Sequence, residues 1–136
     1  MNTIVSYDTL NMIEMRALVK SEYEIEDVIN KCKTKEINLA DGENRKANMQ
    51  FMFDHDLMPC DICNFVRNYL RKEHLYKGPV NDDKNPKRGA IWIFHVLAFD
   101  TWCYVKIQIK DRGNLVHVIS FHEQELGGKN EKSILH

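Results

Sequence analysis

The hydrophobic period of this chain changes near residue 90, and that change restricts the folds it can adopt. Up to that point apolar residues recur at helical spacing, for example along 62–70. From Ala90 onward they alternate with other residues, most regularly in TWCYVKIQIK at 101–110. The segments 90–99, 101–110 and 115–123 are therefore expected to be strands joined by short turns. Helices first and strands afterwards predict an α+β fold, with N-terminal helices packed on one face of a C-terminal antiparallel sheet.

The helical part of the sequence divides into several predicted elements. Helices are expected over 9–22, 24–33, 44–57 and 58–74, with a short strand over 36–41. The last of these helices has Pro59 in its first turn and Asp61 where the helix dipole favours an anion. Its expected buried stripe consists of Ile62, Phe65, Val66, Tyr69 and Leu70. The segment 75–89 is expected to be a loop, because its prolines, glycines and charges leave little to bury.

Length and composition indicate a single globular domain. A chain of 136 residues can bury a substantial core. The first twenty residues lack the basic start and apolar run of a signal peptide, and no apolar run approaches the roughly 18 residues of a membrane helix. The four cysteines are then expected to be reduced thiols. These features predict a cytoplasmic protein that does not enter a membrane.

Burial of the alternate apolar residues selects one register for the last two strands. A three-residue turn at 112–114 pairs Asp111 with Leu115 and places His117 on the apolar side. The register opposes Tyr104 with His122 and Lys106 with Ser120 on the polar face, and Val105 with Phe121 and Ile107 with Ile119 on the buried face. Directly opposed side chains are near neighbours, so a phenol and an imidazole should meet on the polar face.

Those polar residues suit cleavage of an RNA phosphodiester without a metal. His122 can transfer a proton, since imidazole ordinarily titrates near pH 6.5. Tyr104 can be its partner acid or base if neighbouring lysines lower the phenol's pKa. Lys106 and Lys77 would hold phosphate oxygens, and Trp92 or Trp102 could stack on a base. A solvated face or a protein-binding surface remains an alternative reading of the same pattern.

Charge along the chain also favours a local anion site. The net charge is −1, which argues against a globally basic nucleic-acid binder. Residues 71–112, however, hold nine Lys and Arg against five Asp and Glu. Arg88 and Lys110 in this segment are expected to add RNA contacts.

A zinc site is a weaker possibility. His55, Cys60, Cys63 and His74 have the residue types of zinc ligands, but only one Cys pair is present. The segment around Cys60 and Cys63 also reads as a core helix, where cysteine is a small apolar filler. Because only one Cys pair is present, no metal is expected. No Walker or dinucleotide fingerprint occurs either, so no nucleotide cofactor is expected.

Four pieces of the sequence resemble the MqsR family of toxins from bacterial type II toxin–antitoxin systems. They are CNFVRNYLRKEHLYKG, IW, YVKIQI and VISFHE, in the family's order and spacing. The resemblance implies a RelE-like fold, cleavage of mRNA and a cognate antitoxin. By position, Lys77 follows the tyrosine of the family's YK pair, Tyr104 and Lys106 match its Y-x-K, and His122 matches the position after SF. The resemblance covers residues 54–124, which are expected to form a toxin-like core. The residue pattern predicts a helical N-terminal extension over 1–53, without a counterpart in the family, and a loose tail over 125–136.

One position departs from the family pattern. The glutamine that follows the strand tryptophan in the best-known member is Ile93 here. Either that glutamine is dispensable, or His95 on the same strand face substitutes for it. The sequence thus predicts a metal-independent endoribonuclease toxin acting on mRNA. The alternative is a non-catalytic RNA- or protein-binding module of the same fold.

Overall fold

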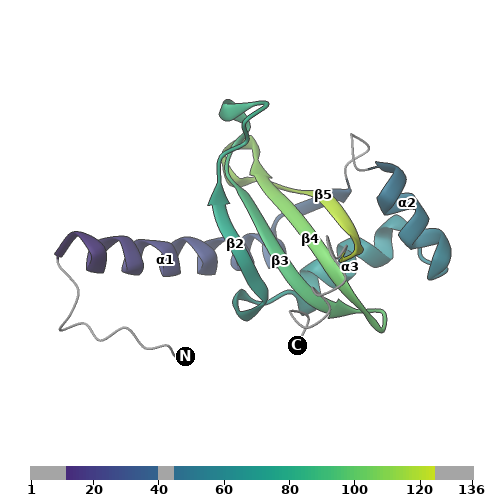
Figure 1. Cartoon of the computed structure of the whole chain (residues 1–136). Coiled ribbons are helices and arrows are strands. Elements are labelled where there is room, and N and C mark those ends of the chain that lie inside the picture. The colour runs from purple at the N-terminus through teal and green to yellow at the C-terminus, as the bar shows by residue number, and fades with distance from the viewer. Residues whose placement is uncertain (1–11, 40–44, 125–136) are drawn as a thin grey trace.

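The computed structural model describes residues 12–39 and 45–124, and within the first helix it describes side chains at Met12 and from Glu24 onward. The predicted tail over 125–136 lies outside these residues. The elements are α1 (Met12–Thr34), β1 (Glu36–Leu39), α2 (Arg45–Asp54), α3 (Pro59–Tyr69), β2 (Leu75–Val80), β3 (Ile91–Ala98), β4 (Thr101–Lys110) and β5 (Leu115–Glu123), with 3-10 turns at Lys72–His74, Pro86–Arg88 and Asp111–Gly113. Figure 1 shows α1 extending away at one side of the sheet, with α2 and α3 at the other.

The five strands form one mixed sheet in the order β1-β5-β4-β3-β2. The predicted α+β class is confirmed. The prediction of a wholly antiparallel sheet after all helices is wrong, because β1 precedes α2 and pairs with β5 in parallel. Within the described residues, no helix has the length and apolar composition needed to cross a membrane.

The segment predicted as a loop over 75–89 begins with the edge strand β2. This strand pairs with β3 through two register irregularities. Gly78 and Pro79 lie within it, and proline is tolerated at an edge strand because only one side of the strand is paired. The turn signals were therefore compatible with a strand at the margin of the sheet.

Helix α3 covers the sheet much as its sequence predicts. Asp61 Oδ2 accepts a hydrogen bond of 2.8 Å from the Met58 amide, which stabilises the start of the helix. Ile62, Val66 and Leu70 are fully buried at successive four-residue intervals. Tyr69 was predicted in the same stripe, but its side chain is 62% exposed, so that part of the prediction is wrong.

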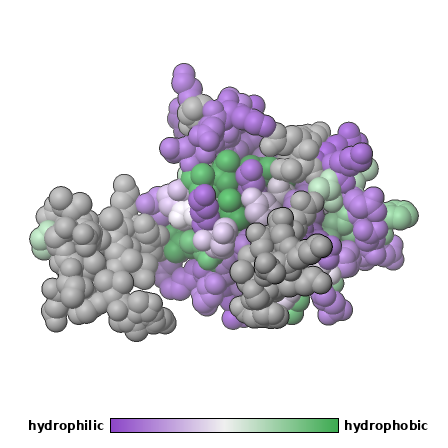
Figure 2. All heavy atoms as spheres, in the orientation of Figure 1, coloured by the Kyte–Doolittle hydropathy of each residue, from purple (hydrophilic) through white to green (hydrophobic). Residues whose placement is uncertain are grey.

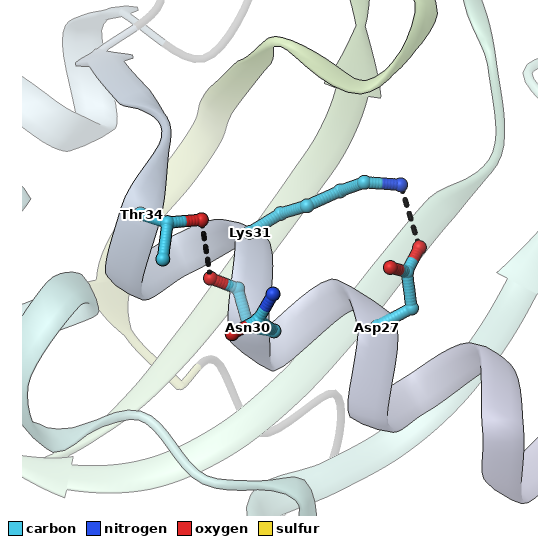
Figure 3. Close-up of polar contacts among 4 residues, drawn as sticks. All are labelled: Asp27, Asn30, Lys31 and Thr34. Atoms are coloured by element: carbon cyan, nitrogen blue, oxygen red, sulfur yellow. Dashed lines mark hydrogen bonds and ion pairs between the residues drawn. The ribbon is translucent and has the colours of Figure 1, made fainter.

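The C-terminal end of α1 contacts both α3 and the turn after β4. The two predicted helices of this region are one continuous helix, whose last turns carry the Lys31–Asp27 ion pair and a 2.9 Å bond from Thr34 Oγ1 to the Asn30 carbonyl (Figure 3). Arg67 of α3 donates to the carbonyls of Lys33 and Lys35, each at 2.7 Å, and so satisfies acceptors that the ending helix leaves open. A Cβ at Gly113 would lie only 3.0 Å from Lys31 Cε. The lysine stem therefore packs closely on this turn.

A one-residue bulge in β5 changes which side chains face the core. Pairing of Tyr104 with His122, of Lys106 with Ser120 and of Val105 with Phe121 is confirmed. The predicted partners of Ile107 and Asp111 are wrong: Ile107 pairs with Val118, and Leu115 pairs with Lys110. Ile119 is the extra residue. Before it the even-numbered residues of β5 face the core, and after it the odd-numbered ones do.

The bulge also moves His117 from the predicted apolar side to the open face. Val116 and Val118 are fully buried instead, as is Phe121 beyond the bulge. His117 Nδ1 lies 2.6 Å from Asn38 Oδ1 on β1. The helices pack on the opposite face of the sheet, the one that carries Val116, Val118 and Phe121, and share one core with it. To this core α1 contributes Ile25, Val28 and Cys32, and α2 contributes Phe51.

Candidate functional site

Four aromatic or imidazole rings from four adjacent strands form a row across the open face of the sheet. Tyr76 of β2 stacks on His95 of β3, with ring centroids 4.0 Å apart and planes 16° apart. His95 and Tyr104 of β4 are 6.1 Å apart and tilted by 44°. Tyr104 and His122 of β5 are stacked again, at 5.5 Å and 18°. The predicted meeting of Tyr104 with His122 is thus part of a longer row.

The hydrogen bond of His122 fixes which of its ring nitrogens can accept a proton. Nδ1 lies 3.0 Å from the carbonyl oxygen of Glu123. A carbonyl can only accept, so Nδ1 carries the proton in this contact. The neutral ring then keeps its lone pair on Nε2, which is the nitrogen able to act as a base.

The environment of Tyr104 favours the protonated phenol. Burial, and then the nearby Tyr76 phenol, raise the pKa of Tyr104 above its ordinary value. The sequence allowed Tyr104 to be an acid or a base on the condition that lysines lower this pKa, and that condition is not met. Tyr104 can therefore donate a hydrogen bond or a proton at neutral pH, but it is not suited to be a base.

Two lysines flank Ile93 in the row next to the rings. Lys77 pairs with Ile93, and Ile93 pairs with Lys106, so the three residues come from neighbouring strands. Lys77 is exposed and Lys106 is half-buried. Because adjacent strands are about 4.8 Å apart, long side chains from both lysines can reach an anion placed beside Tyr104.

His95 lies between the two tyrosines and is half-buried. Burial lowers its pKa, which favours the neutral ring. Its pairing with Tyr104 keeps it on the open face, where the sequence placed it as a substitute for the family glutamine. A neutral imidazole there can donate or accept a hydrogen bond.

The two tryptophans lie on opposite faces. Trp102 is 37% exposed on the open face, at the end of the sheet nearest His122. Trp92 is 3% exposed and belongs to the core, so the prediction that it could stack on a base is corrected. Successive side chains of β3 point to opposite faces. Trp92 therefore points to the core, while Ile93 and His95 point to the open face.

Arg88 and Lys110 lie apart from the ring row. Lys110 is six residues beyond Tyr104 on β4, or about 20 Å along a strand. Arg88 is exposed in the turn Pro86–Arg88, next to Gly89, where a Cβ would lie only 2.3 Å from the Ile109 carbonyl oxygen. Arg88 is exposed and Lys110 is half-buried, and both lie at the far end of the sheet, where they could contact only an extended ligand.

Buried Gln108 anchors the basic loop at this far end. Its Nε2 donates to Asp82 Oδ2 at 2.9 Å and to the Gly89 carbonyl at 3.0 Å. Asp82 Oδ1 in turn accepts from the amides of Lys84 and Asn85. The bond from Gln108 is the largest cause of a lowered Asp82 pKa. One side chain from β4 therefore holds both ends of the loop.

An open cavity of about 780 Å³ adjoins the ring row between α2 and the ends of β4 and β5. His122 borders both the cavity and the row. Lining side chains include Gln50, Phe51, Asp54, Trp102, His122 and Gln124. None of the described residues that line it is a lysine or an arginine.

The predicted zinc-type residues make other contacts. Cys63 Sγ donates to the Ile37 carbonyl at 3.8 Å, and His74 Nδ1 accepts from the Arg71 amide at 3.0 Å. Across residues 12–39 and 45–124, no three His, Cys, Asp or Glu side chains gather as a metal-binding group. Cys60 is exposed in the first turn of α3.

Sequence reasoning missed Tyr76 and the α2 side of the cavity. Tyr76 directly precedes Lys77, but the loop assigned to 75–89 hid its place on a strand. Phe51 and His55, with ring centroids 4.3 Å apart, reach the cavity from a helix predicted only as cover for the sheet.

Figure 2 shows hydrophobic surface among hydrophilic side chains over the sheet, and exposed apolar residues of the open face include Leu97 at 55%.

Comparisons of the chain with protein-family models, with curated proteins and with solved structures give no significant match.

Proposed function

We propose that this chain is a metal-independent endoribonuclease that cleaves mRNA, a cytoplasmic toxin of a type II toxin–antitoxin system with a RelE-like fold. The observation that carries the proposal is the pairing of Tyr104 with His122 on the open face, their rings 5.5 Å apart. A proton acceptor and a proton donor at one place are what transesterification of RNA requires. The sequence resemblance to MqsR toxins points to the same residues.

Each side chain then has a defined task. His122 Nε2 takes the proton of the 2′-hydroxyl, whose oxygen forms a bond to phosphorus. The bond from phosphorus to the 5′-oxygen breaks, and the Tyr104 hydroxyl gives that oxygen its proton. The products are a 2′,3′-cyclic phosphate and a free 5′-hydroxyl. Water then gives a proton back to the Tyr104 phenolate and takes one from the His122 imidazolium, so the cycle balances.

The cations of the neighbouring row would stabilise the charge that builds on the phosphate. Lys106 and Lys77 can approach the non-bridging oxygens from two strands, with Ile93 between them. His95, neutral at physiological pH, can hold the Tyr104 hydroxyl or a ribose hydroxyl in position. Trp102 offers a stacking surface for a base beside His122.

A direct test compares cleavage of single-stranded RNA by purified variants. Tyr104→Phe and His122→Ala should each lower the rate at least about a hundredfold, with thermal unfolding nearly unchanged because both side chains lie on the open face. Tyr69→Phe, an exposed tyrosine of α3, is the matched control and should cleave normally. Wild-type cleavage should persist in a chelator. Retained cleavage by either site variant would overturn the assignment.

The same variants test the toxin role in cells. Expression of the wild-type chain in bacteria should arrest growth, and His122→Ala should relieve the arrest. The resemblance predicts a cognate antitoxin, and its binding over the open face would block RNA access. A protein that arrests growth equally well without His122 would act by another route.

A non-catalytic binding module is the second candidate. The apolar Ile93 between two lysines and the exposed Leu97 and Tyr76 favour it, because such residues suit contact with a partner more than proton transfer. RNA binding by the wild type without any cleavage would select this candidate over the first.

A further inference from the structure

We infer that the cavity between α2 and the ends of β4 and β5 is a nucleobase subsite that selects bases bearing an exocyclic amino group. This inference rests on the proposed RNA-cleaving function. It places the base next to the scissile phosphate in the cavity. The phosphate itself lies beside Lys77 and Lys106, which are called the lysine row.

The position of the cavity supports this division. His122 lines the cavity, and its ring stacks on Tyr104. A nucleotide whose phosphate lies at Tyr104 and His122 therefore has its base within reach of the cavity. At about 780 Å³ the cavity is in the range of small-molecule sites.

The charge of the lining separates base from phosphate. Asp54, Asp100 and Glu123 are carboxylates, and no lysine or arginine is among the described lining residues. A phosphate would be repelled here, whereas the lysine row attracts it. The RNA backbone should therefore run along Lys77 and Lys106, with a base turned toward α2.

The side chains inside the cavity have the character of a base-reading site. Trp102 supplies a partly exposed ring for stacking, which every base can use. The acceptors supply selectivity. Gln50 Nε2 donates to Asp54 Oδ1 at 2.8 Å, which leaves Asp54 Oδ2 as an acceptor without a hydrogen-bond partner in the described part of the chain.

A second acceptor is already withdrawn from water. The side-chain oxygen of Gln124 is fully buried and has no hydrogen-bond partner among the described residues. Its backbone is fixed, because the Gln124 amide donates to the Trp102 carbonyl at 2.9 Å. A buried acceptor without a donor is costly, and a rotation of the Gln124 side chain that turns this oxygen into the cavity would let a ligand N–H offset that cost.

Acceptors facing a base edge favour an amino group. Adenine, cytosine and guanine each present one, whereas the only donor on the Watson–Crick edge of uracil is its ring N3–H, with carbonyl oxygens on both sides that two carboxylate or amide oxygens would repel. A site that hydrogen-bonds such a group discriminates against a base without it by roughly tenfold or more. The cavity should thus prefer adenine, cytosine or guanine to uracil at one position of the RNA.

The test uses trinucleotides with 2′-O-methyl groups, which bind but cannot be cleaved by 2′-hydroxyl attack. Affinities for the uridine trinucleotide and for those with one uridine replaced by adenine, cytosine or guanine are measured from tryptophan fluorescence or by calorimetry. Wild-type protein should prefer an amino-bearing base at one position by about tenfold. Asp54→Asn should reduce that ratio, and Asp56→Asn, an exposed neighbour with the same charge change, should leave it unchanged.

A stacking variant separates affinity from selectivity. Trp102→Ala should weaken all four trinucleotides by similar factors, while Trp102→Phe restores most of the binding. Trinucleotides that bind with no preference, an unchanged ratio in Asp54→Asn, or no binding at all would overturn the subsite. Base-selective binding by a protein that does not cleave ordinary RNA would keep the subsite and refute the nuclease.

Discussion

Asn48 of α2 takes the place of a neighbouring strand for the last part of β5. Its side-chain nitrogen donates to the Ile119 carbonyl at 3.0 Å, and its side-chain oxygen accepts from the Phe121 amide at 2.9 Å. β1 pairs with β5 only as far as Val118, so the backbone beyond that point needs other partners. The carboxamide is 1% exposed and holds the strand immediately before His122.

Removing this carboxamide should destabilise the protein. Asn48→Ala leaves a buried amide and a partly buried carbonyl unpaired, which should lower the free energy of unfolding by about 1 to 3 kcal/mol. Urea denaturation measures the change. Asn64→Ala, at an exposed position of α3, is the control and should stay within about 0.5 kcal/mol of wild type. Equal effects at the two sites would show that the bridge does not stabilise β5.

Stability should depend on pH through His95. Burial lowers the pKa of His95 in the folded chain below the ordinary value of 6.5. The unfolded chain therefore binds the proton at a higher pH, so acidification favours unfolding. The stability that neutral His95 contributes is present above pH 6.5 and is lost as the pH falls through the folded pKa. His95→Gln, which cannot be protonated, should show a shallower loss of stability between neutral and acid pH in denaturant titrations. An identical slope in both proteins would contradict this.

The basic loop should be released when Gln108 is changed. Gln108→Leu removes the donor that holds Asp82 and the Gly89 carbonyl, so the loop carrying Lys84, Lys87 and Arg88 should open more often. Limited trypsin digestion should cut this loop several-fold faster, with cleavage sites read by mass spectrometry. Gln50→Leu on α2 is the matched control. The carboxyl pKa of Asp82 should also rise in Gln108→Leu, because its main stabilising hydrogen bond is gone.

Thiol reactivity should report the burial of the cysteines. Burial raises the pKa of Cys32 and of Cys103 to about 12, and it also raises that of Cys63. Since the thiolate is the reactive form, an aromatic disulfide reagent should label exposed Cys60 first and Cys63 more slowly. Cys32 and Cys103 should react only on unfolding. Cys60→Ser should abolish the fast phase, and a fast phase that survives would place another thiol at the surface.

Local pattern was sufficient to predict the elements that follow one rule along most of their length. The four-residue repeat of Ile62, Val66 and Leu70 was found, and so was the alternation of β3 and β4, apart from Ile91 at the start of β3 and Gln108 under the basic loop, which are buried on the other face. Pairing of Tyr104 with His122 was also predicted, because burial of Val105 against Phe121 leaves one register for that part of the hairpin.

Features that depend on distant residues or on a break in the pattern were not predicted. The bulge at Ile119 has a local trace, two adjacent apolar residues in an alternating strand, but its stabilising partner Asn48 is 71 residues away in the chain. β2 was hidden by a Gly-Pro pair that only an edge strand tolerates. The cavity required α2 to be placed against the end of the sheet, which no periodicity specifies.

No two rings of the row Tyr76, His95, Tyr104 and His122 come from the same strand, and this has a consequence for when the row can exist. Synthesis from the N-terminus delivers its members one strand at a time, with His122 last. A nascent or truncated chain that lacks β5 has three of the rings and no partner for Tyr104. Only a polypeptide synthesised through β5 can assemble the whole row.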